Sequence, residues 1–302
     1  MPPTRITGRG LLSSNSTMNR LKELDPYAFL MPALFFVIGA ELLPAGYTIY
    51  LSFTEWNIIT SPEWTGFSNY LAVFTSPQVL NALKNTVLWV LGTLGFPVVL
   101  ALFLAVIINS VKFQGFFKTI FYIPVTLAPT VAGVIWKIAY STQNGAINSI
   151  LQSMGFGPFQ LLANGSINTF LMIGVWAWQF MGLNLVLFLV GLQSLPKSPI
   201  EAARVDGASF WQIFYHVTLP LLKPITMLVI ANAMINTTRM FAIPWVMTHG
   251  GPARASETLA ISMYRESFLL SNMGYGSAIA VVIALITLIF AWRNLRAFKP
   301  SA

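Results

Sequence analysis

Polar side chains within two apolar stretches of the sequence are the residues best suited to bind a small molecule. They are Trp176, Trp178, Gln179 and Asn184 in one stretch and Asn232, Asn236 and Arg239 in the other. The last three recur at i, i+4 and i+7, so one face of a helix would carry all of them. Amide and guanidinium groups form planar hydrogen bonds and tryptophan offers an aromatic face, a combination suited to a sugar. Hydrogen bonding between helices and interfacial anchoring of tryptophan are the alternative roles.

Residue types needed for catalysis are scarce. The two histidines, His216 and His249, fall on opposite sides of the predicted membrane, and the sequence has no cysteine and no metal-binding motif. A membrane-integral transferase would need paired carboxylates, for which Glu201 and Asp206 are the only candidates near the cytoplasmic face. An ion-coupled carrier would need acidic side chains inside the membrane, and Glu41 is the only acidic residue within a predicted span. We therefore predict that the chain is not an enzyme.

The composition predicts the elements that must position these side chains. Hydrophobic residues make up 56% of the 302 residues and charged residues only 9%, against roughly 25% charged in an average soluble domain. Six apolar stretches are long enough to cross a bilayer as helices, at residues 28–50, 87–108, 119–140, 169–192, 225–247 and 274–292. We therefore predict an all-α, polytopic membrane protein with six transmembrane helices. Residues 1–27 hold no apolar run, so they are not a cleavable signal peptide.

The distribution of lysine and arginine predicts the orientation. Twelve of them lie in segments 1–27, 109–118, 193–224 and 293–302, whereas the opposite side holds three, Lys84, Arg254 and Arg265. Cytoplasmic loops carry the excess of positive charge, so both termini are predicted to be cytoplasmic. The predicted organisation is a cytoplasmic N-terminal segment 1–27, a membrane domain 28–297 and a cytoplasmic tail 298–302. The aromatic-rich outer loop 52–82 is predicted to be an interfacial belt, with contact to a partner as the alternative.

The cytoplasmic loop 195–223 is predicted to form two short helices joined at a bend. Ser198 with Glu201 forms a capping-box pattern, with Pro199 at the first helical position. Gly207 suits a left-handed helix end, and Ser209 with Gln212 forms a second capping-box pattern. Pro220 is expected to end the second helix.

The second helix of this loop carries an apolar stripe of Phe210, Ile213, Phe214 and Val217, at i, i+3, i+4 and i+7. The stripe is expected to face the bilayer interface, the rest of the chain or another protein.

The motif within the loop resembles a known family. Glu201-Ala202-Ala203, three residues, Gly207, nine residues and Val217-Thr218-Leu219-Pro220 resemble the coupling-loop signature of permease subunits of binding-protein-dependent ABC importers, with valine where the family has isoleucine. Further runs resemble the sugar-import branch: Gly66-Phe67-Ser68-Asn69-Tyr70, Asn85-Thr86, Tyr122-Ile123-Pro124, and Gly250-Gly251-Pro252 with Tyr264 and Phe268. Among these permeases, the chain resembles the larger maltose-transporter type and the glycerol-3-phosphate type.

This resemblance implies a type I importer permease fold and a role in passing a sugar, such as a di- or oligosaccharide, inward. Two ATPase subunits would bind ATP and magnesium, so this chain itself would hold no cofactor. A second, different permease and an extracytoplasmic solute-binding protein are the other implied partners, in a bacterial-type inner membrane. The implied ATPase contact comprises Glu201, Ala202, Ala203 and Gly207, with Phe210 and Phe214 as anchors.

The resemblance also points to a solute pathway. Counted from Glu201, Trp178 and Asn236 match a tryptophan and an asparagine of the maltose-type subunit, whereas Gln179, Leu183, Thr237 and Met240 differ from it. The predicted pathway residues are Trp178, Gln179, Asn232, Asn236 and Arg239. Glycerol 3-phosphate is the alternative cargo, since Arg239 could serve a phosphate.

Overall fold

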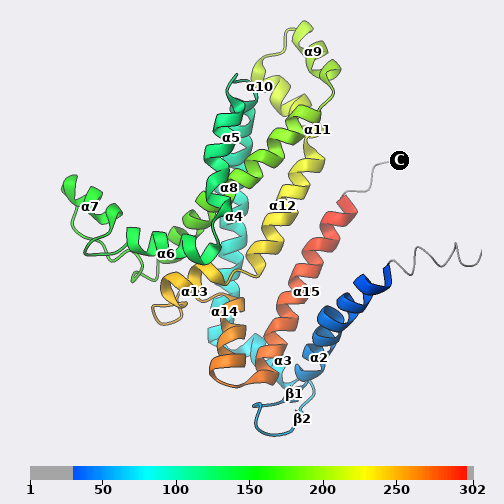
Figure 1. Cartoon of the computed structure of the whole chain (residues 1–302), viewed down its shortest axis with the longest axis vertical. Coiled ribbons are helices and arrows are strands. Elements are labelled where there is room, and N and C mark those ends of the chain that lie inside the picture. The colour runs from blue at the N-terminus through cyan, green and yellow to red at the C-terminus, as the bar shows by residue number, and fades with distance from the viewer. Residues whose placement is uncertain (1–29, 298–302) are drawn as a thin grey trace, which may run out of the picture. The chain divides into compact units, whose positions relative to one another are not determined.

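The computed structural model describes residues 30–297, so the predicted terminal segments 1–27 and 298–302 lie outside the described residues (Figure 1). The chain divides into two compact units, Met1–Tyr50 and Leu51–Ala302. The first unit contributes the helix that begins at Leu30, in which the π-helix η1 (Val37–Leu42) leads into α2 (Leu43–Leu51). This helix has nearly the same bounds as the predicted span 28–50.

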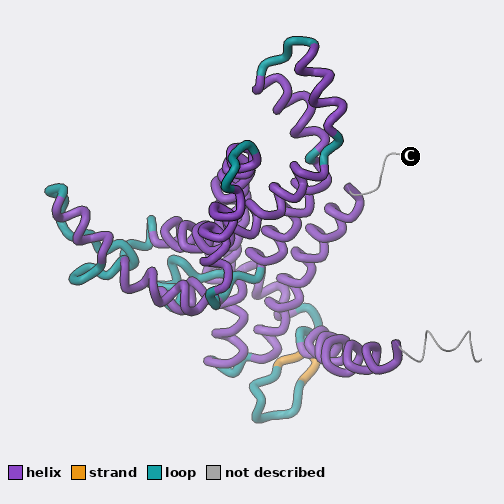
Figure 2. The backbone as a smooth tube through the Cα atoms, turned by 45° about the horizontal axis from the view of Figure 1, so that its top comes forward, coloured by secondary structure: helices purple, strands orange, loops and turns teal. Residues whose placement is uncertain are grey.

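The predicted outer loop 52–82 folds as a hairpin followed by a short helix. Strands β1 (Thr54–Glu55) and β2 (Glu63–Trp64) pair antiparallel, with Thr54 opposite Trp64 (Figure 2). Helix α3 (Ser68–Thr75) follows, and its Asn69 Nδ2 donates to the carbonyls of Ser52 at 3.1 Å and Thr54 at 2.8 Å. Asn69 of the Gly-Phe-Ser-Asn-Tyr run therefore holds the hairpin in place.

Helices α4 (Pro77–Asn109) and α8 (Asn168–Ser194) lie side by side and form the core of the second unit. Helix α4 begins ten residues before the predicted span, because Ser76 caps it and Pro77 occupies a favoured first-turn position. Large side chains of both helices are fully buried between them, including Trp89, Phe188 and Leu185.

The predicted span 119–140 is not one continuous helix. Helix α5 (Gln114–Tyr122) passes into the 3-10 helix η2 (Ile123–Thr126), and α6 (Pro129–Ala139) leaves at an angle of 94°. Pro129 forces Ala128 into an extended conformation, with ψ 141°, which ends the helix before it. Helix α7 (Ala146–Ser153) occupies the following uncharged loop.

The predicted span 225–247 is also broken, because α12 (Lys223–Thr238) is only 16 residues long and α13 (Ala242–Thr248) follows separately. The two-helix segment that precedes it consists of α9 (Lys197–Val205), α10 (Phe210–Ile213), the π-helix η3 (Phe214–Thr218) and α11 (Leu219–Leu221). The chain bends by 68° between Leu221 and Lys223. The helix thus ends at Leu221, one residue after Pro220, close to the end expected from the sequence.

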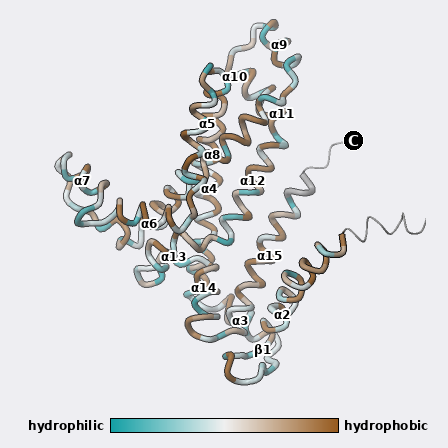
Figure 3. Tube along the Cα trace, in the orientation of Figure 1, coloured by the Kyte–Doolittle hydropathy of each residue, from teal (hydrophilic) through white to brown (hydrophobic). Residues whose placement is uncertain are grey.

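The last elements are α14 (Leu259–Tyr264), the π-helix η4 (Arg265–Leu269) and the long α15 (Met273–Ala297). A second apolar cluster packs α15 against the start of α4, through Ile279, Ala278, Val79 and Ala82. In the described part of the chain, four helices are long and apolar enough to cross a membrane, or up to six if each bent pair counts as one span. Hydrophobic residues predominate along α4 and α15, whereas α9 is largely hydrophilic (Figure 3).

Candidate functional site

The two-helix segment 195–223 lies at the far end of α8 and α12 and turns at Gly207 (Figure 1). Gly207 has φ +78°, the left-handed conformation predicted from the sequence. The N–H groups of Gly207 and Ala208 donate to the carbonyls of Arg204 at 3.1 Å and Ala203 at 3.0 Å, which closes the end of α9. The bend is therefore a hydrogen-bonded unit, and a side chain at Gly207 would meet no atom within 4 Å.

One of the two predicted capping boxes is formed. Ser209 Oγ accepts from the Gln212 N–H while the Gln212 side chain accepts from the Ser209 N–H, at 3.4 and 2.7 Å. The predicted box at Ser198 is wrong, because α9 begins earlier, with Pro196 at its N-cap. Glu201 and Ala202 are exposed on α9, Ala203 is half-buried there, and Gly207 is exposed at the bend that follows. Most of the predicted ATPase contact therefore lies on the accessible surface of this segment.

The predicted apolar stripe is divided between the interior and the surface. Ile213 is buried and Phe214 is half-buried, whereas the Phe210 side chain is 61% exposed. Trp211 and Tyr215, which the stripe pattern did not include, stack on each other at 6.0 Å and are also exposed. A cavity of about 500 Å³ separates these aromatic rings from α4. The aromatic surface is therefore wider than periodicity predicted.

The polar candidates of α8, which include the predicted pathway residues Trp178 and Gln179, lie at different depths. Gln179 is fully buried, and its Nε2 donates to the Leu127 carbonyl at 2.7 Å, while its Oε1 has no partner among the described residues. Asn184 is also buried, and its Nδ2 has no hydrogen-bond partner among the described residues. Trp178 is half-buried and packs edge-to-face on Trp136 at 5.6 Å. Gln179 thus links α8 to the segment before α6 through its Nε2. The Gln179 Oε1 and the Asn184 Nδ2 are the two buried side-chain atoms of α8 that lack a hydrogen bond among the described residues.

The predicted polar face of α12 is formed. Asn236 Nδ2 donates to the carbonyl of Asn232 at 2.8 Å and to its Oδ1 at 2.9 Å, and Asn236 is exposed. No hydrogen bond or ring contact of the described residues joins Trp178 to Asn236.

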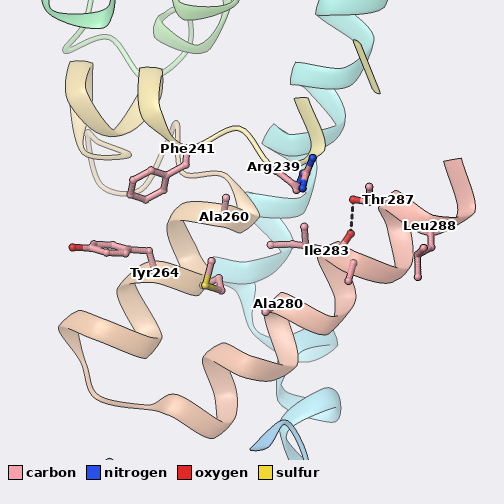
Figure 4. A pocket seen from close by; sticks show the side chains of 10 residues that line it. Arg239, Phe241, Ala260, Tyr264, Ala280, Ile283, Thr287 and Leu288 are labelled. Atoms are coloured by element: carbon pink, nitrogen blue, oxygen red, sulfur yellow. Dashed lines mark hydrogen bonds between the residues drawn. The ribbon is translucent and has the colours of Figure 1, made fainter. Parts of the chain in front are cut away.

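Arg239 lies beyond the end of α12 and borders a cavity of about 600 Å³ (Figure 4). The other walls come from the start of α13, from α14 and from α15: Phe241, Ala260, Met263, Tyr264, Ala280, Ile283, Ala284, Thr287 and Leu288. Nearly all of this lining is apolar. Among the described residues that border the cavity, Arg239 carries the only charge.

Sequence reasoning missed the buried carboxylate of Glu257. Glu257 has no exposed surface, accepts from Ser262 Oγ at 2.7 Å and pairs with Arg265 at 3.3 Å and Arg254 at 3.6 Å. Asn85 Nδ2 donates to the carbonyl of Glu257 at 3.0 Å, so α4 holds the same loop. The available signal was the position of Glu257 eight residues before Arg265 and just after the Gly-Gly-Pro run.

Comparison with known families identifies the family to which the chain belongs. Residues 96–296 match the family described as binding-protein-dependent transport system inner membrane component. The chain belongs to this family. It is a membrane permease of the ABC importer type, and the prediction of a transport component rather than an enzyme is confirmed.

Related permeases match over most of their length. The osmoprotective compounds uptake permease protein of Synechocystis sp. is 34% identical, covering 90% of this chain and 98% of that protein. The arabinooligosaccharides transport system permease protein of Bacillus subtilis is 33% identical, covering 91% and 88%. The sn-glycerol-3-phosphate transport system permease protein of Agrobacterium fabrum is 32% identical, covering 88% and 92%.

Solved structures share the fold of the permease. A chain of a bacterial alginate ABC transporter, in complex with alginate pentasaccharide-bound periplasmic protein, aligns with a TM-score of 0.79 at 20% identity, covering 92% of this chain and 94% of that one. A second structure, of a bacterial ABC transporter involved in the import of the acidic polysaccharide alginate, aligns with a TM-score of 0.73 at 22% identity, covering 93% and 100%. The ABC permease-like fold predicted from the sequence is thus confirmed.

Proposed function

We propose that this permease forms part of the membrane pathway for a sugar, such as a di- or oligosaccharide, that moves inward at the expense of ATP. The observation that carries the proposal is the hydrogen-bonded bend at Gly207, which follows the Glu201-Ala202-Ala203 run on the surface of α9. The relative named for arabinooligosaccharides supports a polyhydroxylated cargo.

The two-helix segment would transmit movement from the ATPase. Glu201, Ala202, Ala203 and Gly207 would enter a cleft of an ATP-binding subunit, with Phe210 and Phe214 as apolar anchors. A helical segment closed by hydrogen bonds moves as a body, whereas an irregular loop would absorb the displacement. ATP and magnesium would bind to the two ATPase subunits, and this chain would hold neither.

The remaining organisation follows the importer scheme. Six spans within residues 28–297, including the two bent pairs, would leave the segments 1–27 and 298–302 in the cytoplasm. An extracytoplasmic solute-binding protein would deliver the sugar, a role supported by the alginate transporter, which was solved in complex with a pentasaccharide-bound periplasmic protein. A second, different permease would complete the pathway in a bacterial-type inner membrane.

Solute contacts would come from α8 and from α12 with the residue after it, through Trp178, Gln179, Asn232, Asn236 and Arg239. The Asn232–Asn236 pair and the Gln179 Oε1, which has no partner among the described residues, are groups that could accept from or donate to hydroxyls. Glycerol 3-phosphate is a second candidate cargo, favoured by Arg239 at the cavity and by the relative named for this solute.

The decisive experiment is reconstitution. The chain is co-expressed with candidate ATPase, permease and binding-protein partners, and uptake of a labelled sugar into vesicles is measured with and without ATP. We expect uptake only in the complete, ATP-supplied system. ATP-independent uptake by this chain alone under an ion gradient would instead support a secondary carrier.

A further inference from the structure

We propose that Arg239 makes this permease selective for a solute that carries a carboxylate or a phosphate on its sugar or glyceryl unit. The inference rests on the proposed solute pathway and narrows its cargo to an anion.

The Arg239 guanidinium has no counter-ion among the described residues of its unit. It extends from the residue that follows α12, is exposed, and takes part in none of the hydrogen bonds or ion pairs of this part of the chain. A cation in a membrane-embedded region without a partner is costly, so such residues face a cavity or a partner that compensates the charge. Arg239 does face a cavity.

The acidic residues of the second unit are engaged or located elsewhere. Glu257 pairs with Arg265 and Arg254, and Glu266 lies 3.9 Å from Arg254 and accepts from Asn272. The other described acids of this unit lie in the outer hairpin and in the two-helix segment: Glu55, Glu63, Glu201 and Asp206. None of them lines the Arg239 cavity.

The cavity has the size and walls of a solute site. Its volume of about 600 Å³ falls within the range of roughly 300–1,000 Å³ that is usual for ligand pockets. Phe241 and Tyr264 pack against each other at 5.2 Å on one side, and Arg239 and Thr287 lie on the other (Figure 4). The Thr287 hydroxyl is already donated to the Ile283 carbonyl at 2.8 Å.

This lining favours an anion over a neutral sugar. Tyr264 and Thr287 supply the only hydroxyl groups among the described lining side chains, so a neutral sugar would lose many hydrogen bonds to water on entering. A carboxylate or phosphate would gain a bidentate contact with the guanidinium beside apolar walls.

The test measures charge preference on the assembled complex. The purified complex in nanodiscs is titrated with D-glucuronate and D-glucose, and with sn-glycerol 3-phosphate and glycerol, without binding protein. We expect one of the anions to bind at least about tenfold more tightly than its neutral partner. We expect Arg239→Gln to abolish this preference and Arg239→Lys to retain part of it. Lys84→Gln removes the same charge from an exposed site on α4 and should change nothing.

Three outcomes would overturn the inference. Equal binding of charged and neutral probes to the wild-type complex excludes an anion site. An effect of Arg239→Gln seen only in nanodiscs with anionic lipid assigns the arginine to lipid phosphate. A fall in yield and melting temperature with unchanged preference assigns it to a carboxylate of another protein segment. If the wild-type complex carries a neutral sugar with ATP but binds charged and neutral probes equally, only this inference fails. If the complete wild-type system with ATP takes up no solute at all, the proposed function itself is contradicted.

Discussion

The side-chain amide of Gln179 donates a hydrogen bond of 2.7 Å to the carbonyl of Leu127, at the point where the chain between η2 and α6 turns by 94°. A bend inside a membrane frees backbone carbonyls that water cannot satisfy. Gln179, from the neighbouring α8, satisfies one of them. Gly182, one turn further along α8, permits the close approach, since a Cβ there would overlap the Phe121 carbonyl.

Gln179→Leu should therefore destabilise the complex. The substitution leaves the Leu127 carbonyl without its donor, which costs about 1–3 kcal/mol. The melting temperature and the uptake rate are expected to fall together. Asn184→Leu is the matched control on the same helix, because the Asn184 Nδ2 has no partner among the described residues to lose. A melting temperature that falls equally in both variants would contradict the assignment.

Gly207→Asp should separate ATP hydrolysis from transport. Gly207 has φ +78°, where a side chain costs about 1 kcal/mol, but the space around it is open within this chain. The complex should assemble, and stimulation of the ATPase by loaded binding protein should be lost. Gly155→Asp tests the same strain elsewhere, because Gly155 has φ +86°, equally open space and a place in the loop after α7. Wild-type stimulation in Gly207→Asp would disprove the coupling role.

Much of the fold could be predicted from hydropathy, but hydropathy did not place the breaks within two of the apolar runs. Apolar runs 119–140 and 225–247 have the length of a span, yet the structure breaks them at Leu127 and at Arg239. Pro129 could have signalled the first break, because the residue before a proline resists helical geometry. The break at Arg239 carries no such local signal, since the residues that follow it are ordered by contacts far along the chain, such as the Thr258 hydroxyl on the Met240 carbonyl.

The candidate site also has some features that the sequence predicts and others that depend on packing between distant segments. Gly207 and the Ser209 cap are set by local backbone chemistry, so the sequence predicts both. The hydrogen bonds of Glu257 and of Gln179 depend on which distant segments pack together, and no periodic pattern encodes them. Burial of Ile213 with exposure of Phe210 on one stripe likewise depends on where α4 lies.

Asn236→Ala should lower uptake without lowering stability. The Asn236 amide bonds to Asn232 on its own helix and is exposed, so its loss should leave the melting temperature nearly unchanged. A missing hydrogen bond to a solute hydroxyl costs about 1–3 kcal/mol, or roughly five- to hundredfold in uptake. ATPase stimulation by loaded binding protein should persist. If melting temperature, ATPase activity and uptake decline in parallel, Asn236 instead holds helices together.

Glu257→Gln should loosen the loop 249–258. The carboxylate is fully buried between Arg254, Arg265 and the Ser262 hydroxyl. Glutamine has the same shape but no charge, so the two arginines lose their shared counter-ion while the Ser262 bond can still form. Because the arginine side chains are 32% and 24% exposed, solvent offsets part of the loss, and we expect a cost of about 1–3 kcal/mol. Hydrogen exchange of the loop amides should accelerate, and the melting temperature of the complex should fall.

Glu63→Gln removes one charge from an exposed position of β2 and should leave both measurements unchanged. Unaltered exchange in Glu257→Gln would mean that the loop is held by Asn85 and its backbone contacts alone, and that the carboxylate serves another purpose.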